Sequence, residues 1–165
     1  MISETLIPEF DHEIKTTRNV LERVDWEKKD WKPHEKSMTF GGLAAHVAEI
    51  GMWCISTLNT SGIDMEKNPY FPPAFSSLEE LLKDFDSKIK EGRALLEKTS
   101  DEAFMETWTM KAGEKVFMSM PRIAAYRSIV IKHTVHHRGQ LSVYLRMNDI
   151  PVPSIYGPSA DEAAL

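Results

Sequence analysis

The sequence predicts an all-α fold, a four-helix bundle formed by a single domain over residues 1–165. Four segments carry apolar residues at alternating spacings of three and four, which is typical of amphipathic helices that face a core. The segments between them contain Pro, Asn and Gly without a sustained period, so we interpret them as long connections. A chain of 165 residues can close one sizeable core, and four such helices in one domain favour a bundle.

The first helix is expected over residues 4–24. Ser3 is a candidate cap, and Pro8 either lies in the early turns or delays the helix start. The next segment, VDWEKKDWKPHEKSM, is interpreted as a connection that ends at a cap on Thr39. About 14 residues can span roughly 46 to 50 Å, more than the roughly 30 Å of a 20-residue helix, so up-and-down and up-up-down-down arrangements are both allowed.

The second helix is expected over residues 40–58, and small residues in its first half would let a neighbouring backbone approach closely. These small residues are Gly41, Gly42, Ala44, Ala45 and Ala48. The third helix is SSLEELLKDFDSKIKEGRALLEK, residues 76–98. It is expected to start at a cap on Ser76 or Ser77, with Glu79 or Glu80 completing a capping box.

The segment TWTMKAGEKVFMSM, residues 107–120, alternates around KAGE and indicates either a short β-hairpin or an irregular flap. The fourth and longest helix is expected over residues 121–147. Pro121 suits its first turn, and Asn148, Pro151 and Pro153 stop it. The remaining tail, SIYGPSADEAAL, is expected to be extended.

Composition excludes several classes of protein. The formal charge is −5, with 25 acidic and 20 basic residues mixed along the chain, which disfavours nucleic acid as a partner. No apolar run approaches the ~20 residues that cross a bilayer, so no membrane association is expected. The start MISETLIPEF is acidic, unlike a secretory leader, and the single cysteine, Cys54, excludes an internal disulfide. A cytoplasmic location is therefore expected.

Histidines are concentrated in IKHTVHHRGQL, residues 131–141. His133 and His137 are four residues apart, so they share one helix face, which we expect to point into the bundle. His136 is a less favoured partner at a spacing of three. Each buried imidazole nitrogen without a partner costs about 1 to 3 kcal/mol. A divalent cation would satisfy these nitrogens, and Zn²⁺, Ni²⁺ and Fe²⁺ all accept imidazole.

The third metal ligand is expected from the second helix, where His46 is the natural candidate. His46 lies about 10 Å from the start of its helix and His137 about 15 Å from the end of the fourth, so their levels match if these helices run antiparallel. The alternative is that all three are ordinary histidines, either in the core with backbone partners or on a polar surface. The residues alone leave that alternative open.

Further residues near this cluster are candidates for contacts around a metal or a bound molecule. They are Glu49, His136, Gln140 and Tyr144. Glu49, one turn after His46, could orient a ligand or act as a base. Each candidate is equally consistent with a packing or surface role. Arg138 is interpreted as a salt-bridge or interface residue, and no residue is assigned a catalytic role.

Three segments together closely resemble the DinB-like, damage-inducible proteins of bacteria: WKPHEKSMTFGGLAAHVAE, IKHTVHHRGQLSVYLR and PSIYGPSADE. The resemblance covers essentially the whole chain. It implies a bundle with up-up-down-down topology and long connections, a homodimer, and a divalent metal held by histidines at the positions of His46, His133 and His137. Similar proteins include S-transferases and an isomerase that use mycothiol or bacillithiol.

These observations define three hypotheses for function. The first is a metal-dependent enzyme, a thiol S-transferase or hydrolase, in which a low-molecular-weight thiol or a water binds at an open metal position. The second is a non-catalytic metal-binding stress-response protein. The third is a dimeric helical interaction module without a metal. A catalytic site keeps an exchangeable coordination position, whereas a structural site is closed by a fourth protein ligand.

Overall fold

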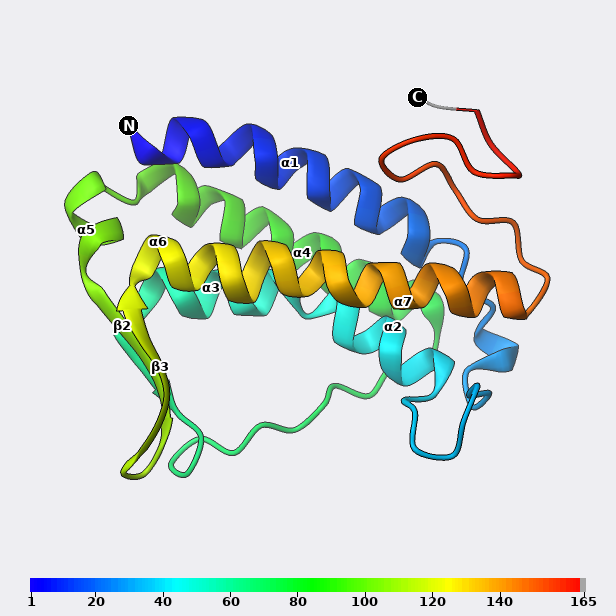
Figure 1. Cartoon of the computed structure of the whole chain (residues 1–165), viewed down its shortest axis with the longest axis horizontal. Coiled ribbons are helices and arrows are strands. Elements are labelled where there is room, and N and C mark those ends of the chain that lie inside the picture. The colour runs from blue at the N-terminus through cyan, green and yellow to red at the C-terminus, as the bar shows by residue number, and fades with distance from the viewer. Residues whose placement is uncertain (164–165) are drawn as a thin grey trace.

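The computed structural model describes residues 1–163, in which long helical segments pack side by side (Figure 1). The first segment is α1, Ile2–Leu21, and the second consists of α2, Phe40–Ala48, and α3, Ile50–Asn59. The third is α4, Leu78–Lys98. The fourth consists of α6, Arg122–Ala125, a π-helical segment, Tyr126–Lys132, and α7, His133–Met147. A 3₁₀ turn, Trp26–Lys28, and a short helix α5, Asp101–Met105, lie in the connections.

The all-α prediction is wrong, because the described residues also form a three-stranded mixed sheet. Its strands are β1, Gly62–Asp64, β2, Thr107–Ala112, and β3, Lys115–Pro121. β2 and β3 form the hairpin that was one of the two sequence interpretations, and β1 adds to β2 in parallel. A strand of three residues has too few positions to show alternation. Gly62 permits the pairing, because a Cβ there would lie 2.2 Å from the carbonyl oxygen of Thr109.

The up-up-down-down topology is also wrong. Following the colours in Figure 1, α1 and the α6–α7 segment run in one direction, and α2–α3 and α4 run in the other. The first connection does not cross the bundle, because it folds back onto the start of α2. The amide of Phe40 donates to the carbonyl of Trp31 at 2.7 Å, and that of Gly41 to the carbonyl of Lys29 at 2.8 Å. α2 and α7 are nevertheless antiparallel, as the histidine argument required.

Most helix boundaries agree with the sequence, and local signals explain them. The hydroxyl of Thr39 accepts from the amide of Gly42, and that of Ser77 from the amide of Glu80, so both expected caps are present. The expected cap on Ser3 is absent, because α1 starts at Ile2 and contains Pro8. The helix predicted over residues 40–58 is interrupted at Glu49, which ends α2 and precedes α3.

The main core lies between the helical segments, and a second apolar cluster lies between the sheet and the start of the fourth helical segment. The largest fully buried side chains of the main core include Phe10, Phe40, Phe85 and Tyr126. The second cluster consists of Trp108, Ala125 and Ile129, with partly buried methionines at positions 110, 118 and 120. The sheet therefore packs against the start of the fourth segment. Within residues 1–163, no helix combines the length and the apolar content needed to cross a bilayer.

The face of the fourth helical segment that enters the core is not the one expected. The buried residues of α7 are Thr134, Arg138, Leu141 and Leu145, while His133 is exposed and His137 partly exposed. The apolar pattern of the sequence did not indicate this core face, because two of its residues are a threonine and an arginine. Both are satisfied inside the protein: the hydroxyl of Thr134 donates to the carbonyl of Val130, and Arg138 pairs with Glu13. The histidines therefore face the edge of the bundle.

Candidate metal centre

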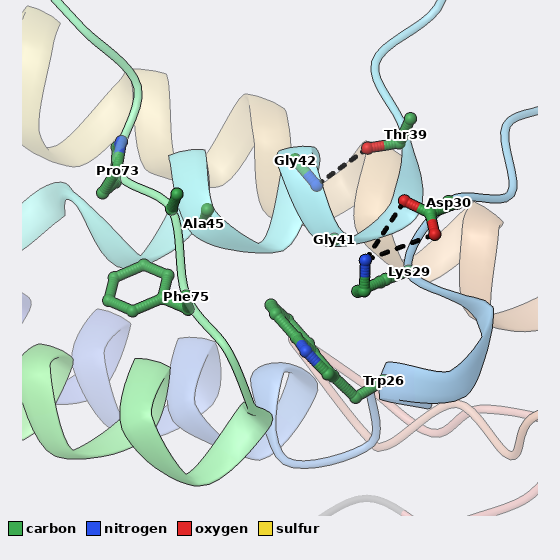
Figure 2. Close-up of a pocket in the computed structure, with 10 residues that line it drawn as sticks. Trp26, Lys29, Asp30, Thr39, Gly41, Gly42, Ala45, Pro73 and Phe75 are labelled. Atoms are coloured by element: carbon green, nitrogen blue, oxygen red, sulfur yellow. Dashed lines mark hydrogen bonds and ion pairs between the residues drawn. The ribbon is translucent and has the colours of Figure 1, made fainter.

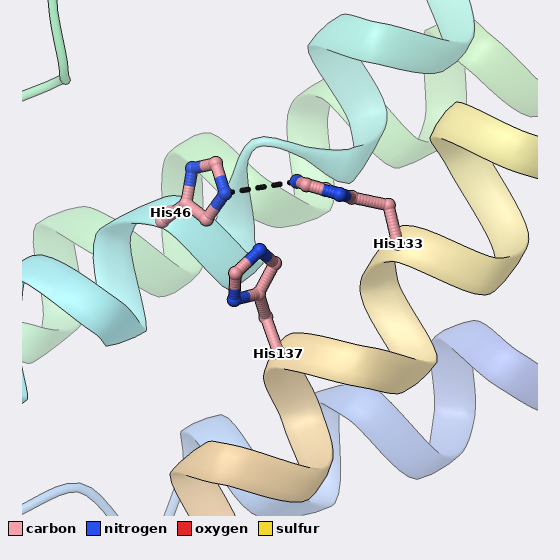
Figure 3. Close-up of side chains that lie close together, drawn as sticks. All are labelled: His46, His133 and His137. Atoms are coloured by element: carbon pink, nitrogen blue, oxygen red, sulfur yellow. Dashed lines mark hydrogen bonds between the residues drawn. The ribbon is translucent and has the colours of Figure 1, made fainter.

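Three histidines from two helical segments converge at the edge of the bundle, where α2 packs against α7 (Figure 3). His46 extends from α2, and His133 and His137 extend from successive turns of α7. One nitrogen atom of each ring lies within 4.8 Å of those of the other two. Ring centroids are 4.4 Å apart for the α7 pair and 4.5 and 5.1 Å from His46 to His137 and His133.

These distances suit a cation bound by imidazole nitrogens. Zinc–nitrogen bonds are about 2.0 to 2.1 Å long, so two ligands of a tetrahedral ion lie roughly 3.3 Å apart. The Nε2 atoms of His46 and His133 are 3.0 Å apart, close to that separation. The donor set, with all three nitrogens within 4.8 Å of one another, therefore fits a divalent cation after adjustment of the side chains.

The local sequence explains why α2 and α7 bring these rings together. The i, i+4 spacing places His133 and His137 on one face of α7. On α2, three small residues near His46, Ala44, Ala45 and Ala48, are buried against the rest of the protein. Short side chains let the backbone of α2 lie close to its neighbours, which brings the ring of His46 within reach of α7.

In two of the three rings, the nitrogen that points away from the cluster contacts a neighbouring side chain. Nδ1 of His46 lies 3.0 Å from Oε2 of Glu49, and Nδ1 of His137 lies 2.8 Å from Oε1 of Gln140. Metal-binding histidines usually have such partners, which fix the tautomer and direct the other nitrogen at the metal. Of the residues that the sequence named as candidates near the cluster, Glu49 and Gln140 contact its rings.

The other candidates lie outside this contact set. The hydroxyl of Tyr144 donates to the carbonyl of Met38 at 3.2 Å, and its ring packs against Trp31 and Phe40. His136 is exposed, with its ring centroid 4.7 Å from that of His137, and it is not part of the three-nitrogen cluster. Arg138 is buried in an ion pair with Glu13, 2.7 Å away, in agreement with its interpretation as a salt-bridge residue.

The pKa values of the α7 histidines favour the neutral, metal-binding form. Partial desolvation of the imidazole, followed by repulsion from His137 and His46, lowers the pKa of His133 from 6.5 to about 4, although the residue as a whole is exposed. Burial also lowers the pKa of His137, although its hydrogen bond to Gln140 opposes the shift. Since imidazole must be neutral to bind a metal, both rings are ready to act as ligands at neutral pH.

Sequence reasoning missed Tyr70. Its hydroxyl donates to Oε2 of Glu49 at 2.5 Å and lies 3.5 Å from Nδ1 of His46. Tyr70 belongs to the stretch NPYFPPAF, where no period indicates the direction of any side chain. The aromatic residue among prolines was the only signal, and it could not be assigned to the histidine cluster without the fold.

A small cavity of about 160 Å³ lies near the start of α2 (Figure 2). Trp26 and Phe75 lie on one side of it, and Gly41, Gly42 and Ala45 of α2 lie on the other. None of the three clustered histidines lines this cavity.

The single cysteine, Cys54, is not expected to bind a metal. Its side chain is fully buried, and burial raises the pKa of its thiol to about 12. Cys54 is therefore a core residue.

Comparison with known families gives a match over most of the chain. The profile of the DinB superfamily matches residues 9–141. The chain belongs to this superfamily. A curated relative, the uncharacterized protein YrdA of Bacillus subtilis (strain 168), is 49% identical over 35 residues. That alignment covers only 21% of either chain, so it says nothing about the rest of the relative.

Two solved structures of DinB-like proteins share the fold. A DinB-like protein of Bacillus cereus ATCC 10987 has a TM-score of 0.72 at 19% identity, covering 93% of this chain and 97% of its own. The DinB-like protein YjoA of Bacillus subtilis has a TM-score of 0.67 at 17% identity, covering 89% and 95%. The family resemblance in the sequence is therefore confirmed, and the sheet-containing helical fold of this chain is similar to that of solved DinB-like proteins.

Proposed function

We propose that this DinB superfamily protein binds a divalent cation through His46, His133 and His137. The observation that carries the proposal is the convergence of three imidazole nitrogens, from α2 and α7, within 4.8 Å of one another. The lowered pKa values of His133 and His137 and the partners of His46 and His137 support it. Zinc, nickel and iron all suit an imidazole donor set, and the proposal covers the three metals.

The exposure of the cluster supports an open coordination position. Among residues 1–163, the cluster has three members and no fourth carboxylate, thiol or imidazole completes it. His133 is exposed, so the cation position would be reachable from solvent. A bound cation would supply Lewis acidity, lowering the pKa of a water or thiol that binds to it. We therefore propose a metal-dependent enzyme, either a thiol S-transferase that uses a low-molecular-weight thiol as one substrate or a hydrolase that uses water.

The residues of this chain would have separate tasks in such a reaction. His46, His133 and His137 would hold the cation, while Glu49 and Gln140 keep the rings of His46 and His137 in position. Glu49 is buried and hydrogen-bonded, so its carboxylate is better placed to orient His46 than to take a proton from a substrate. The alternative proposal is a non-catalytic metal-binding stress-response protein. A homodimer and a cytoplasmic location remain part of both proposals.

Elemental analysis of natively purified protein tests the metal site. We expect about one equivalent of a divalent metal per chain in the wild type and loss of most of it in His46→Ala. The matched control is His34→Ala, because His34 is exposed in the first connection, where its Nδ1 accepts from the amide of Lys36. Full metal content in His46→Ala, or equal loss in both variants, would exclude the proposed ligand set.

An activity assay separates the two proposals once metal is present. Metal-loaded protein is mixed with an electrophilic acceptor and cysteine, glutathione or bacillithiol, and consumption of the thiol is measured. Turnover that disappears in His46→Ala supports the enzyme. No turnover with any thiol, in protein that retains its metal, favours the non-catalytic protein. Light scattering of the same samples measures whether the chain is a dimer.

A further inference from the structure

The connection between β1 and α4 contributes one residue to the surroundings of the histidine cluster. Residues 65–77 form neither helix nor strand and carry the chain back along the bundle to the start of α4 (Figure 1). Tyr70, in the middle of this connection, donates its hydroxyl to Oε2 of Glu49 at 2.5 Å. The same oxygen lies 3.0 Å from Nδ1 of His46. Donors from the connection and from α2 thus converge on one carboxylate oxygen.

Because Glu49 is buried, the loss of either hydrogen bond would leave its carboxylate oxygen without a full set of donors. The residue is only 5% exposed, so little water is available to replace a lost donor. An ionised carboxylate only accepts hydrogen bonds, which means that Tyr70 and His46 must both present a hydrogen to it. His46 then carries its proton on Nδ1, and the lone pair of Nε2 faces the other histidines. Orientation of Glu49 and the tautomer of His46 are therefore linked.

The aromatic ring of Tyr70 holds the connection against α3. Its centroid lies 6.1 Å from that of Trp53, which is one turn after Glu49. The next residue, Phe71, is 80% exposed. The side chain of Tyr70 thus attaches this part of the connection to α3, while that of its neighbour extends into solvent.

We propose that Tyr70 is a positioning residue of the metal site, whose hydroxyl holds Glu49 in the orientation that fixes the Nδ1–H tautomer of His46. This inference rests on the proposed function. The positioning role also couples the metal site to residues 65–77. Because the contact between Tyr70 and Glu49 raises the affinity for the cation, the bound cation stabilises that contact by the same free energy. Cation binding thereby strengthens the docking of residues 65–77 on the helices.

Tyr70→Phe tests the role, because it removes the hydroxyl and keeps the ring against Trp53. The matched control is Tyr144→Phe, which removes a hydroxyl that donates to the carbonyl of Met38 instead. Competition titrations with Zn²⁺ or Co²⁺ measure the affinity. Loss of a side chain that supports a metal ligand typically weakens binding 10- to 100-fold, and we expect roughly 10-fold for Tyr70→Phe and less than about 2-fold for Tyr144→Phe.

A spectroscopic readout in metal-free protein is independent of the metal. Long-range ¹H–¹⁵N correlation spectra report which ring nitrogen of His46 carries the proton. We expect the Nδ1–H form in the wild type and in Tyr144→Phe, and a mixture of tautomers in Tyr70→Phe. Hydrogen–deuterium exchange of the backbone amides of residues 65–77 measures docking of the connection, and we expect the cation to slow it in the wild type but not in Tyr70→Phe.

The outcomes separate this inference from the proposed function. If the wild type binds the cation and Tyr70→Phe matches it in affinity and His46 tautomer, the positioning role is overturned and the metal site stands. If the wild type binds no cation, the proposed function and the coupling both fail, and the tautomer of His46 alone decides whether Tyr70 positions it. Circular dichroism of each variant verifies that it is folded.

Discussion

Single buried side chains connect distant parts of this chain, and Arg138 is the clearest case. It is 1% exposed and donates to the backbone carbonyl of Glu13 and the hydroxyl of Thr17, both at 3.0 Å. It also forms an ion pair with the carboxylate of Glu13, which accepts from the hydroxyl of Tyr156. Residues of α1, α7 and the C-terminal tail thus share one buried network.

Replacing Arg138 should destabilise the protein strongly. Arg138→Met leaves the Glu13 carboxylate buried without its cation, and removal of one partner from a buried pair typically costs about 3 to 5 kcal/mol. Urea unfolding followed by circular dichroism measures the loss. Adding Glu13→Gln to Arg138→Met should recover part of it, because the remaining charge is removed. A loss below about 1 kcal/mol in the single variant would contradict this account of the network.

The lowered pKa of His133 predicts how stability depends on pH. Its pKa is about 4 in the folded protein and 6.5 in an unconstrained chain, so between these values the unfolded state binds more protons. The free energy of unfolding of metal-free protein should therefore fall as the pH decreases from 6.5 to 4. His133 is exposed, and solvent screening keeps the effect smaller than for a fully buried group.

His133→Asn provides the comparison for this pH dependence. Urea midpoints of chelator-treated wild type and variant are measured at pH 7, 5.5 and 4.5. We expect the variant to lose less stability than the wild type on acidification. Identical slopes for the two proteins would show that His133 does not keep its neutral form in the folded state.

At the scale of helices and strands, two glycines allow α3 and α4 to pack closely. A Cβ on Gly51 would lie 2.7 Å from the Cβ of Lys88 and 2.9 Å from the backbone nitrogen of Ile89. A Cβ on Gly92 would lie 2.9 Å from the sulfur of Cys54. Gly139 on α7 differs, because a Cβ there meets nothing within 4 Å.

These environments predict opposite effects of the same substitution. Gly51→Ala forces α3 away from the backbone of α4 and should destabilise the protein by about 1 to 3 kcal/mol. Gly139→Ala adds a methyl group in open space within a helix and should stabilise it by up to about 1 kcal/mol. Thermal unfolding of both variants measures the difference. Stabilisation by Gly51→Ala would mean that the two helices are less closely packed than described.

The sequence predicted the helices far better than their interruptions. Apolar spacing and the caps at Thr39 and Ser77 located the long segments, because both signals are local. The break at Glu49 and the π-helical segment were missed, since a search with a fixed period of 3.6 treats each segment as one continuous helix. The i, i+4 spacing predicted the pair His133 and His137, and matched helix levels together with the family resemblance predicted His46, whereas Tyr70 reaches the cluster from a connection without any period.

At the scale of the whole molecule, the topology depends on contacts that spacing does not report. The first connection was long enough to cross the bundle, and the bonds from Phe40 and Gly41 to the connection show that it folds back instead. The parallel pairing of β1 with β2 joins residues 62–64 to residues 109–111, across the whole of α4. Such pairings arise from tertiary structure, so the mixed sheet could not be predicted from local patterns.

A cation at the proposed site would join two segments that are far apart in sequence, since His46 and His133 lie 87 residues apart. Because only the folded chain brings them together, a free cation at 100 times its dissociation constant should stabilise the protein by about 2.7 kcal/mol. For a domain of this size, that corresponds to a rise in Tm of roughly 5 to 10 °C. Differential scanning fluorimetry with and without Zn²⁺ measures it.

His137→Ala is the matched variant for this measurement, with His34→Ala as the control. We expect the variant to lose the zinc-dependent rise in Tm and the control to keep it. A rise of equal size in His137→Ala would mean that the cation stabilises the protein from another position.

The π-helical segment Tyr126–Lys132 ends directly before His133. A stretch with i→i+5 hydrogen bonds holds one residue more than an α-helical stretch of the same number of turns. Deleting a single residue, such as Ser128, can therefore be absorbed by a return to i→i+4 bonding, with the histidine face of α7 left in its orientation. The same deletion between His133 and His137 would rotate one ring away from the other by about 100°. Length variation among relatives of this chain should accordingly be tolerated before position 133 and rare just after it.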